Sequence, residues 1–125
     1  MIVGIGVDIV EPERIGGMIE RHAGRFLERT FTADEIAYCR GRKRAVEHFA
    51  ARWAAKEAVA KALGTGLARR IGWKDIEVVK DPSGAVGVRL YRKAKTLADK
   101  LGVTRIHLSL SHTEKAAVAV VVAEK

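Results

Sequence analysis

The stretch from residue 45 to residue 63, AVEHFAARWAAKEAVAKAL, decides the fold. It is rich in alanine and contains neither glycine nor proline, so its intrinsic preference for helix is high throughout. Gly64 follows at once and predicts the end of the helix, because glycine readily takes the left-handed conformation that closes helices. We therefore expect a long central helix against which the other elements pack.

The opening segment, residues 2–10, alternates in a way that predicts a strand. One face carries four apolar side chains, and the other carries small or polar residues together with one valine. The first set is Val3, Ile5, Val7 and Ile9, and the second is Gly4, Gly6, Asp8 and Val10. Asp8 is thus expected to lie off the apolar face.

Two shorter helices are expected between this strand and the central helix. Pro12 suits a first helical turn, and residues at the spacing of one helix face follow it: Ile15, Met18, Ile19 and His22. This helix should end near Gly24. Thr32 and Glu35 have the spacing of a capping box, which predicts a short helix from residue 33 that ends near Gly41.

The second half of the chain reads as two hairpins separated by a helix. Strands are expected over residues 76–80 and 86–91, with the turn sequence Asp81-Pro82-Ser83-Gly84 between them. A helix over residues 92–101 should end at Gly102, and strands over residues 106–111 and 116–123 follow. This order predicts an α+β fold with a largely antiparallel sheet, packed by the long central helix and the shorter helices.

Composition limits the class of protein. The 125 residues indicate one domain, residues 1–125, and the formal net charge of +8 indicates an anionic partner. Cys39 is the single cysteine, so no intrachain disulfide can form, which fits a cytoplasmic protein. We recognise no signal peptide and no apolar run long enough to cross a bilayer, so no membrane partner is expected.

The central helix and the first strand hold the acidic candidates. Glu57 and Lys61 share one helix face, either as an ordinary i, i+4 ion pair worth about 0.2–0.5 kcal/mol or as a metal-binding carboxylate beside a phosphate-binding lysine. Asp8 is either a solvated residue at a strand end or a second carboxylate that shares a hard cation with Glu57. Mg²⁺ requires only one or two carboxylates, together with water and phosphate oxygens.

Basic residues gather in two places. Arg14, Arg21 and Arg25 recur along the first helix, either as a solvated face or as a docking stripe for an acidic partner helix. Residues 40–44 form a second basic cluster that suits phosphate groups or water. This cluster motivates an alternative function, a basic nucleic-acid-binding module without catalysis. The aromatic residues do not alternate with basic ones as they do in stacking platforms, which weakens that alternative.

His112 and Thr113 lie at the end of a late strand. His107 and His112 have parities that place them on opposite faces of this strand. A lone histidine is more often structural than catalytic, and no histidine or cysteine spacing indicates zinc.

Several of these segments together resemble one family. Gly6-Val7-Asp8-Ile9-Val10 with Arg14 is similar to its N-terminal G-x-D motif, and Trp53 through Ala62 match its W-x-x-K-E-A-x-x-K-A signature. Residues 26–35, 73–78 and 108–113 are similar to its other blocks. On these motifs the chain is identified as a member of the holo-[acyl-carrier-protein] synthases, group I of the 4′-phosphopantetheinyl transferases.

The resemblance implies transfer of the 4′-phosphopantetheine group from coenzyme A to a serine of apo acyl carrier protein, in fatty acid biosynthesis. Adenosine 3′,5′-bisphosphate would be the other product. The resemblance further implies dependence on Mg²⁺, with Mn²⁺ possible, a homotrimer with intersubunit active sites, and no nucleic acid partner. Asp8 and Glu57 are the implied metal ligands, and Glu57 and Lys61 are the candidate catalytic residues.

The remaining residue roles also come from the resemblance. It suggests that five residues contact coenzyme A: Arg52, Lys61, Gly64, His112 and Thr113. It suggests that Arg14, Arg21 and Arg25 contact the acidic recognition helix of the carrier protein.

Overall fold

The computed structural model describes residues 1–67 and 71–125. Within them the helices are α1 (Pro12–Thr30), α2 (Ala33–Arg40), α3 (Ala45–Ala62) and α4 (Arg92–Leu101), with a 3₁₀ turn η1 at Trp73–Asp75. The strands are β1 (Ile2–Val10), β2 (Ile76–Lys80), β3 (Val86–Leu90), β4 (Arg105–His112) and β5 (Ala117–Glu124). Every expected helix and strand is therefore present, and η1 is the one element in these ranges that the sequence did not predict.

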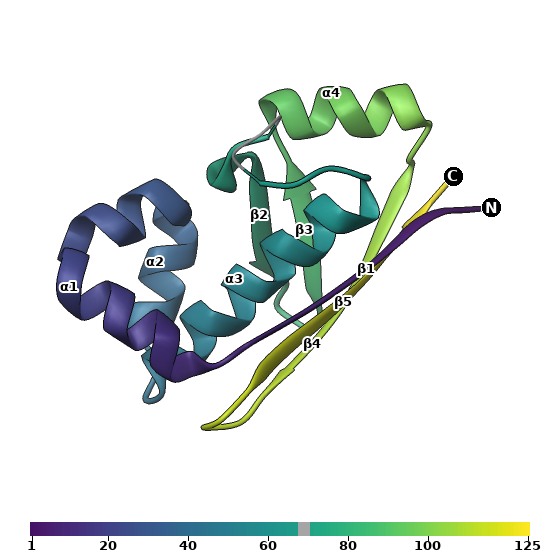
Figure 1. Cartoon of the computed structure of the whole chain (residues 1–125). Helices are drawn as coiled ribbons and strands as arrows, with labels where there is room; N and C mark the ends of the chain where they lie inside the picture. The colour runs from purple at the N-terminus through teal and green to yellow at the C-terminus, as the bar shows by residue number, and fades with distance from the viewer. Residues whose placement is uncertain (68–70) are drawn as a thin grey trace.

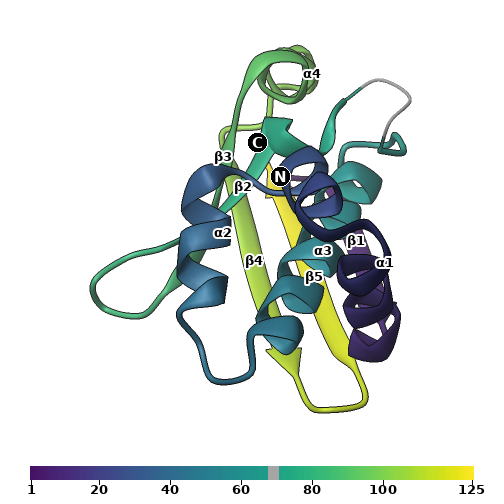
Figure 2. The same cartoon turned by 90° about the vertical axis from the view of Figure 1, so that its left-hand side faces the viewer.

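The sheet is antiparallel throughout. β5 lies between β1 and β4 in a three-stranded sheet, and β2 and β3 form a separate two-stranded hairpin. Helix α3 packs along one face of the larger sheet, α1 and α2 lie toward one end of the molecule, and α4 lies toward the other (Figures 1 and 2). This arrangement confirms the expected α+β fold with a long central helix.

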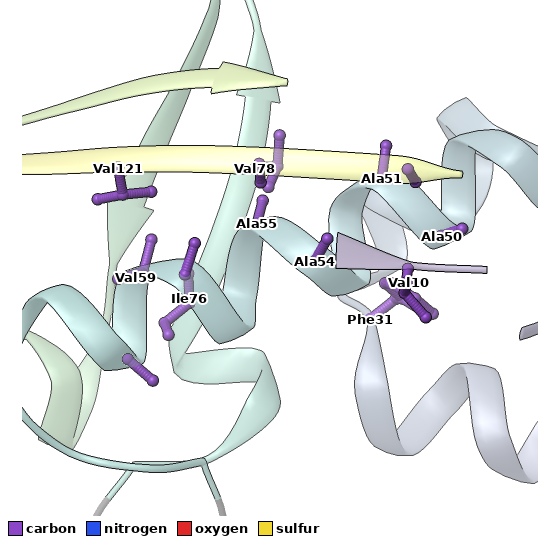
Figure 3. Close-up of a cluster of buried hydrophobic side chains, with 14 of the residues drawn as sticks. Val10, Phe31, Ala50, Ala51, Ala54, Ala55, Val59, Ile76, Val78 and Val121 are labelled. Carbon is purple, nitrogen blue, oxygen red and sulfur yellow. The ribbon is translucent and has the colours of Figure 1, made fainter. Parts of the chain in front are cut away.

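The core lies between α3 and the strands. It is built largely from alanine on α3 and β5, with larger side chains such as Phe31, Val59, Ile76 and Val121 filling the spaces between elements (Figure 3). Small side chains on α3 let the sheet come close to the helix axis, so the helix is buried along most of its length.

The closest approach is between β1 and α3. A Cβ atom added at Gly6 would lie 1.9 Å from the carbonyl oxygen of Ala58, and one added at Gly4 would lie 1.9 Å from that of Ala62. Neither distance is physically possible, so the two backbones touch and only glycine fits at these two positions. We call the residues on this side of β1, Gly4, Gly6 and Asp8, its inner row. The contact presses this row against the helix.

The apolar row of β1 faces away from this core. Ile5 is 63% exposed, Val7 54% and Ile9 69%. Asp8 lies off the apolar face, as expected, but an amphipathic strand usually buries its apolar side, and here that side is open. Val120 of β5 pairs with Val7 and is also exposed, so the outer face of the sheet carries an apolar patch.

Helix α1 breaks at Ala23, where φ is 45° and ψ is −132°, so its first segment ends near Gly24 as expected. A second helical segment, which was not expected, then continues to Thr30. Phe26 and Leu27 beyond the break are buried, so their packing accounts for a second helical segment that the glycine alone argued against. Gly64, with φ of 79°, follows the end of α3 as expected.

A buried ion pair fastens α2 and β2 to the central helix. Lys56 Nζ lies 2.8 Å from Glu35 Oε1, with both side chains fully buried, and it also donates to the carbonyls of Trp73 and Ile76. Glu35 accepts from the backbone of Thr32 and Val78. Burial lowers the pKa of Lys56, and the charge of Glu35 opposes that effect. Both charged groups therefore have the partners that a buried charge requires.

The contact between β1 and α3 yields a prediction about stability. We expect Gly6→Ala to reduce the free energy of unfolding by about 2–3 kcal/mol, because overpacking forces the strand and the helix apart. The measurement is urea denaturation followed by circular dichroism. Gly87→Ala is the matched control, because a Cβ at this strand position would meet Val79 at an ordinary 3.8 Å. Equal stability of the two variants would contradict the close packing described above.

Candidate active site

The inner row of β1 brings Asp8 to the exposed side of α3. Lys61 Nζ lies 3.1 Å from Asp8 Oδ1 and donates a second hydrogen bond to the carbonyl of Val7 at 3.0 Å. The lysine is half exposed, whereas Asp8 is mostly covered. The close approach at Gly6, two residues earlier on the strand, accounts for this contact.

Glu57 lies one helical turn before Lys61 and completes an acidic pair with Asp8. Burial raises the pKa of Glu57, and the negative charge of Asp8 raises it further, while Lys61 and Arg14 act in the opposite direction. Asp8 Oδ2 is buried and has no hydrogen-bond partner in the described part of the chain. Two repelling carboxylates with a spare acceptor oxygen form a suitable environment for a cation.

The donor set is small. Among residues 1–67 and 71–125, no group of three or more histidine, cysteine, aspartate or glutamate side chains is arranged to hold a metal ion. A two-carboxylate site is still compatible with Mg²⁺, which keeps several waters and uses substrate oxygens. The same set does not suit zinc, which prefers nitrogen and sulfur ligands.

Arg14 also lies at this site. Its guanidinium is 5.0 Å from the centre of the Trp53 ring, and that ring stacks on Trp73 at 5.3 Å. Because the charge of Arg14 lowers the pKa of Glu57, the arginine belongs to the same electrostatic environment. No sequence pattern predicts the contact with Trp73, which lies twenty residues after Trp53 and meets it only through tertiary packing.

Arg21 and Arg25 are exposed on α1, but the helix does not present them as one regular row. The break at Ala23 separates them, so helical spacing no longer places Arg25 on the face that carries Arg14. Arg21 precedes the break and Arg25 follows it. Both arginines are therefore at the surface, but they do not form the single straight row on one helix face that their spacing predicted.

A second cluster surrounds Tyr38 on α2. Arg42 lies 4.2 Å and Arg52 4.3 Å from the centre of its ring, and Lys80 Nζ lies 3.0 Å from its hydroxyl. Burial alone would raise the pKa of Tyr38, but the hydrogen bond from Lys80 and the three positive charges outweigh it and lower that pKa. Arg52 is almost fully buried, and its Nε has no hydrogen-bond partner among the described residues. So much uncompensated positive charge suits a ligand with several negative charges.

His112 and Thr113 lie beside this second cluster. His112 Nδ1 is 2.9 Å from Glu47 Oε1, and its ring packs edge-on against His48 at 4.8 Å. The hydroxyl of Thr113 accepts from the backbone of Lys115 and Ala116 and so closes the turn between β4 and β5. Sequence patterns did not predict the other members of this cluster, because they come from α2, α3 and β2 and no fixed spacing relates these elements. These members are Tyr38, Glu47, His48 and Lys80.

The two clusters lie on different sides of α3. Arg52 and Glu57 are five residues apart, which corresponds to about 140° around a helix axis. Asp8 is on β1, at one edge of the sheet, and His112 is on β4, at the other edge, with β5 between them (Figure 2). The structure therefore joins Asp8, Glu57 and Lys61 with Arg14, joins Arg52 with His112, and keeps the two groups apart.

Comparisons with known proteins agree with this fold. Residues 4–121 match the family model described as the 4′-phosphopantetheinyl transferase superfamily. The chain is 50% identical over 124 residues to the holo-[acyl-carrier-protein] synthase of Koribacter versatilis, covering 99% of each chain. The structure of the Neisseria meningitidis holo-[acyl-carrier-protein] synthase superposes with a TM-score of 0.92 at 34% identity, covering 100% of both chains.

A further solved structure, the Helicobacter pylori holo-[acyl-carrier-protein] synthase in complex with coenzyme A, gives a TM-score of 0.84 at 33% identity. The match covers 96% of this chain and 99% of the other. These matches define a phosphopantetheinyl transferase fold and confirm the predicted α+β class. The chain belongs to the holo-[acyl-carrier-protein] synthase family, as the sequence motifs indicated.

Proposed function

We propose that this chain transfers the 4′-phosphopantetheine group of coenzyme A to a serine of apo acyl carrier protein and releases adenosine 3′,5′-bisphosphate. The observation that carries the proposal is the juxtaposition of Asp8, Glu57 and Lys61 where β1 meets α3, in a chain of this family. The structure of a relative in complex with coenzyme A supports the choice of donor. Family membership favours this enzymatic role over a nucleic-acid-binding module.

The acidic pair fits a divalent cation, which we propose to be Mg²⁺, with Mn²⁺ as a possible substitute. Asp8 and Glu57 would hold it, because Asp8 Oδ2 is buried without a partner and Glu57 is affected by the charge of Asp8. A bound Mg²⁺ would neutralise negative charge on the pyrophosphate oxygens of coenzyme A.

In the described part of the chain, no helix has the length and apolar character that a bilayer crossing requires.

The protein side chains supply the remaining chemistry. Lys61 is half exposed beside Asp8, so its ammonium group can approach the leaving phosphate and stabilise the charge that develops there. The serine hydroxyl of the carrier attacks the phosphorus that bears pantetheine and must lose its proton. Glu57 and water at the acidic site are the two candidates for the acceptor of this proton.

The basic surface of α1 suits the carrier protein. Arg21 and Arg25 are exposed, and Arg14 connects this surface to the acidic site through its contact with Trp53. An acidic helix docked along α1 would bring its serine toward Glu57. Opposite charge on the two partners would steer this encounter and weaken with added salt.

A homotrimer with intersubunit sites accounts for two further features. The apolar outer face of the sheet, formed by Ile5, Val7, Ile9 and Val120, is open in the single chain and would be covered by second copies. The second cluster, around Arg52 and His112, lies on the other side of α3 from Glu57. We propose that coenzyme A lies between the Asp8 and Glu57 side of one subunit and the Arg52 and His112 side of the next.

Gly64 and Thr113 have supporting positions in this arrangement. Gly64 follows the end of α3, three residues after Lys61, and its backbone turns with φ of 79°. Thr113 follows His112 at the tip of the β4–β5 hairpin. Each thus borders one of the two halves proposed to contact coenzyme A.

The direct test of the reaction is mass spectrometry. An apo acyl carrier protein incubated with this chain, coenzyme A and Mg²⁺ should gain the mass of one phosphopantetheine group. Substitution of the acceptor serine by alanine in the carrier should abolish the gain. An unchanged carrier mass, at enzyme and substrate concentrations high enough for many turnovers, would refute the proposed activity.

The intersubunit site predicts complementation between two inactive variants. Glu57→Gln damages one half of the site and His112→Ala the other, so each variant alone should have low activity at limiting coenzyme A. In trimers formed by co-expressing both at equal amounts, about one site in four would combine two intact halves, if subunits mix randomly. We therefore expect activity to return to about a quarter of that of the unmodified chain. Absence of any recovery in verified mixed trimers would place both halves in the same subunit.

A further inference from the structure

Glu47 is an acidic residue at the edge of the cationic cluster around Tyr38. It lies in the first turn of α3 and is only 8% exposed. Arg44 and His112 contact it, and His48 packs between His112 and Tyr38, around which Arg42, Arg52 and Lys80 gather. A carboxylate here repels the anion that these cations suit. Its presence therefore calls for a role other than direct contact with that ligand.

The contacts of Glu47 indicate what this role is. Its Oε1 lies 2.9 Å from His112 Nδ1, within hydrogen-bond distance, whereas Oε2 lies 3.7 Å from the guanidinium of the mostly exposed Arg44. An exposed ion pair at that distance contributes little. His112 is therefore the principal partner of Glu47.

This hydrogen bond fixes which ring nitrogen His112 presents. An ionised carboxylate can only accept, so Nδ1 must carry the hydrogen, and Nε2 is left for another partner. The ring of His48 packs edge-on against His112 and restricts its rotation. Burial and the positive charges of Arg52, Arg42 and Lys80 lower the pKa of His48, which favours its uncharged form. The side chain of His112 remains 24% exposed, so it can meet a ligand.

We propose that Glu47 is a positioning residue, which keeps the hydrogen of His112 on Nδ1, so that Nε2 accepts from a hydroxyl or amino donor at the nucleotide end of coenzyme A. The inference rests on the proposed function, since that function supplies the ligand. Glu47 itself does not touch the substrate. Its carboxylate contacts Nδ1, and the ring then presents Nε2 as a fixed acceptor to the ligand.

Steady-state kinetics with coenzyme A and an apo carrier protein test the proposal. We expect Glu47→Ala to raise the KM for coenzyme A about tenfold, the effect of losing one hydrogen bond to a charged group, and to leave kcat and the KM for the carrier within about twofold. Glu47→Gln keeps an acceptor oxygen and should recover most of the loss. Glu114→Ala, an exposed acid two residues after His112, is the control and should behave like the unmodified chain.

A double variant separates positioning from a structural role. If Glu47 acts through His112, adding Glu47→Ala to His112→Ala should raise the KM for coenzyme A no further than His112→Ala alone does. The state of the ring is read independently from ¹⁵N chemical shifts of labelled protein without coenzyme A. The unmodified chain should show hydrogen on Nδ1 of His112, and Glu47→Ala should shift the neutral ring toward hydrogen on Nε2.

Two results would overturn the proposal: an unchanged tautomer in Glu47→Ala, or a full additional loss when Glu47→Ala is placed in the His112→Ala background. If Glu47→Ala does not fold, Glu47→Leu and Glu47→Gln replace it, and the tautomer of His112 in folded Glu47→Leu then decides. Failure of the unmodified chain to bind coenzyme A would refute the proposed function instead, while the ¹⁵N shifts would still report whether Glu47 sets the ring.

Discussion

The contact between the backbones of β1 and α3 at Gly4 and Gly6 determines much of the remaining structure. It requires a helix with small side chains, which the alanine-rich sequence of α3 provides, and a strand without side chains at the two points of contact. Once the strand is pressed against the helix, Asp8 reaches Lys61 and lies near Glu57. The acidic site is thus a consequence of how closely the two elements pack.

The same contact has a second consequence, on the opposite side of the strand. With glycine and Asp8 turned inward, the apolar row of β1 faces outward and joins Val120 of β5 in an open patch. Meanwhile α3 separates the acidic cluster from the cationic one around Arg52 and His112. An exposed apolar face and two half-sites on one chain have a common explanation if the active unit contains several copies, as we propose.

Local patterns in the sequence predicted most elements, because helix propensity, capping and turn residues act over a few positions. They could not predict the second half of α1, where buried Phe26 and Leu27 outweigh the break at Ala23. Alternation in β1 defined two faces but not which one is buried, since the glycine contact with α3 decides that. Family motifs predicted Asp8, Glu57 and Lys61 as site residues, whereas the contacts of Glu47 and Trp73 come from tertiary packing, which leaves no fixed spacing in the chain.

The central claim is that Asp8 and Glu57 bind one divalent cation together. Electron paramagnetic resonance of Mn²⁺ measures this binding directly, in the presence of coenzyme A and without any turnover. We expect one tight site per chain in the unmodified protein, and loss of at least about tenfold in affinity in both Asp8→Asn and Glu57→Gln, since each removes a charged ligand. Mn²⁺ affinity that is unchanged in either variant would contradict the shared site and the mechanism built on it.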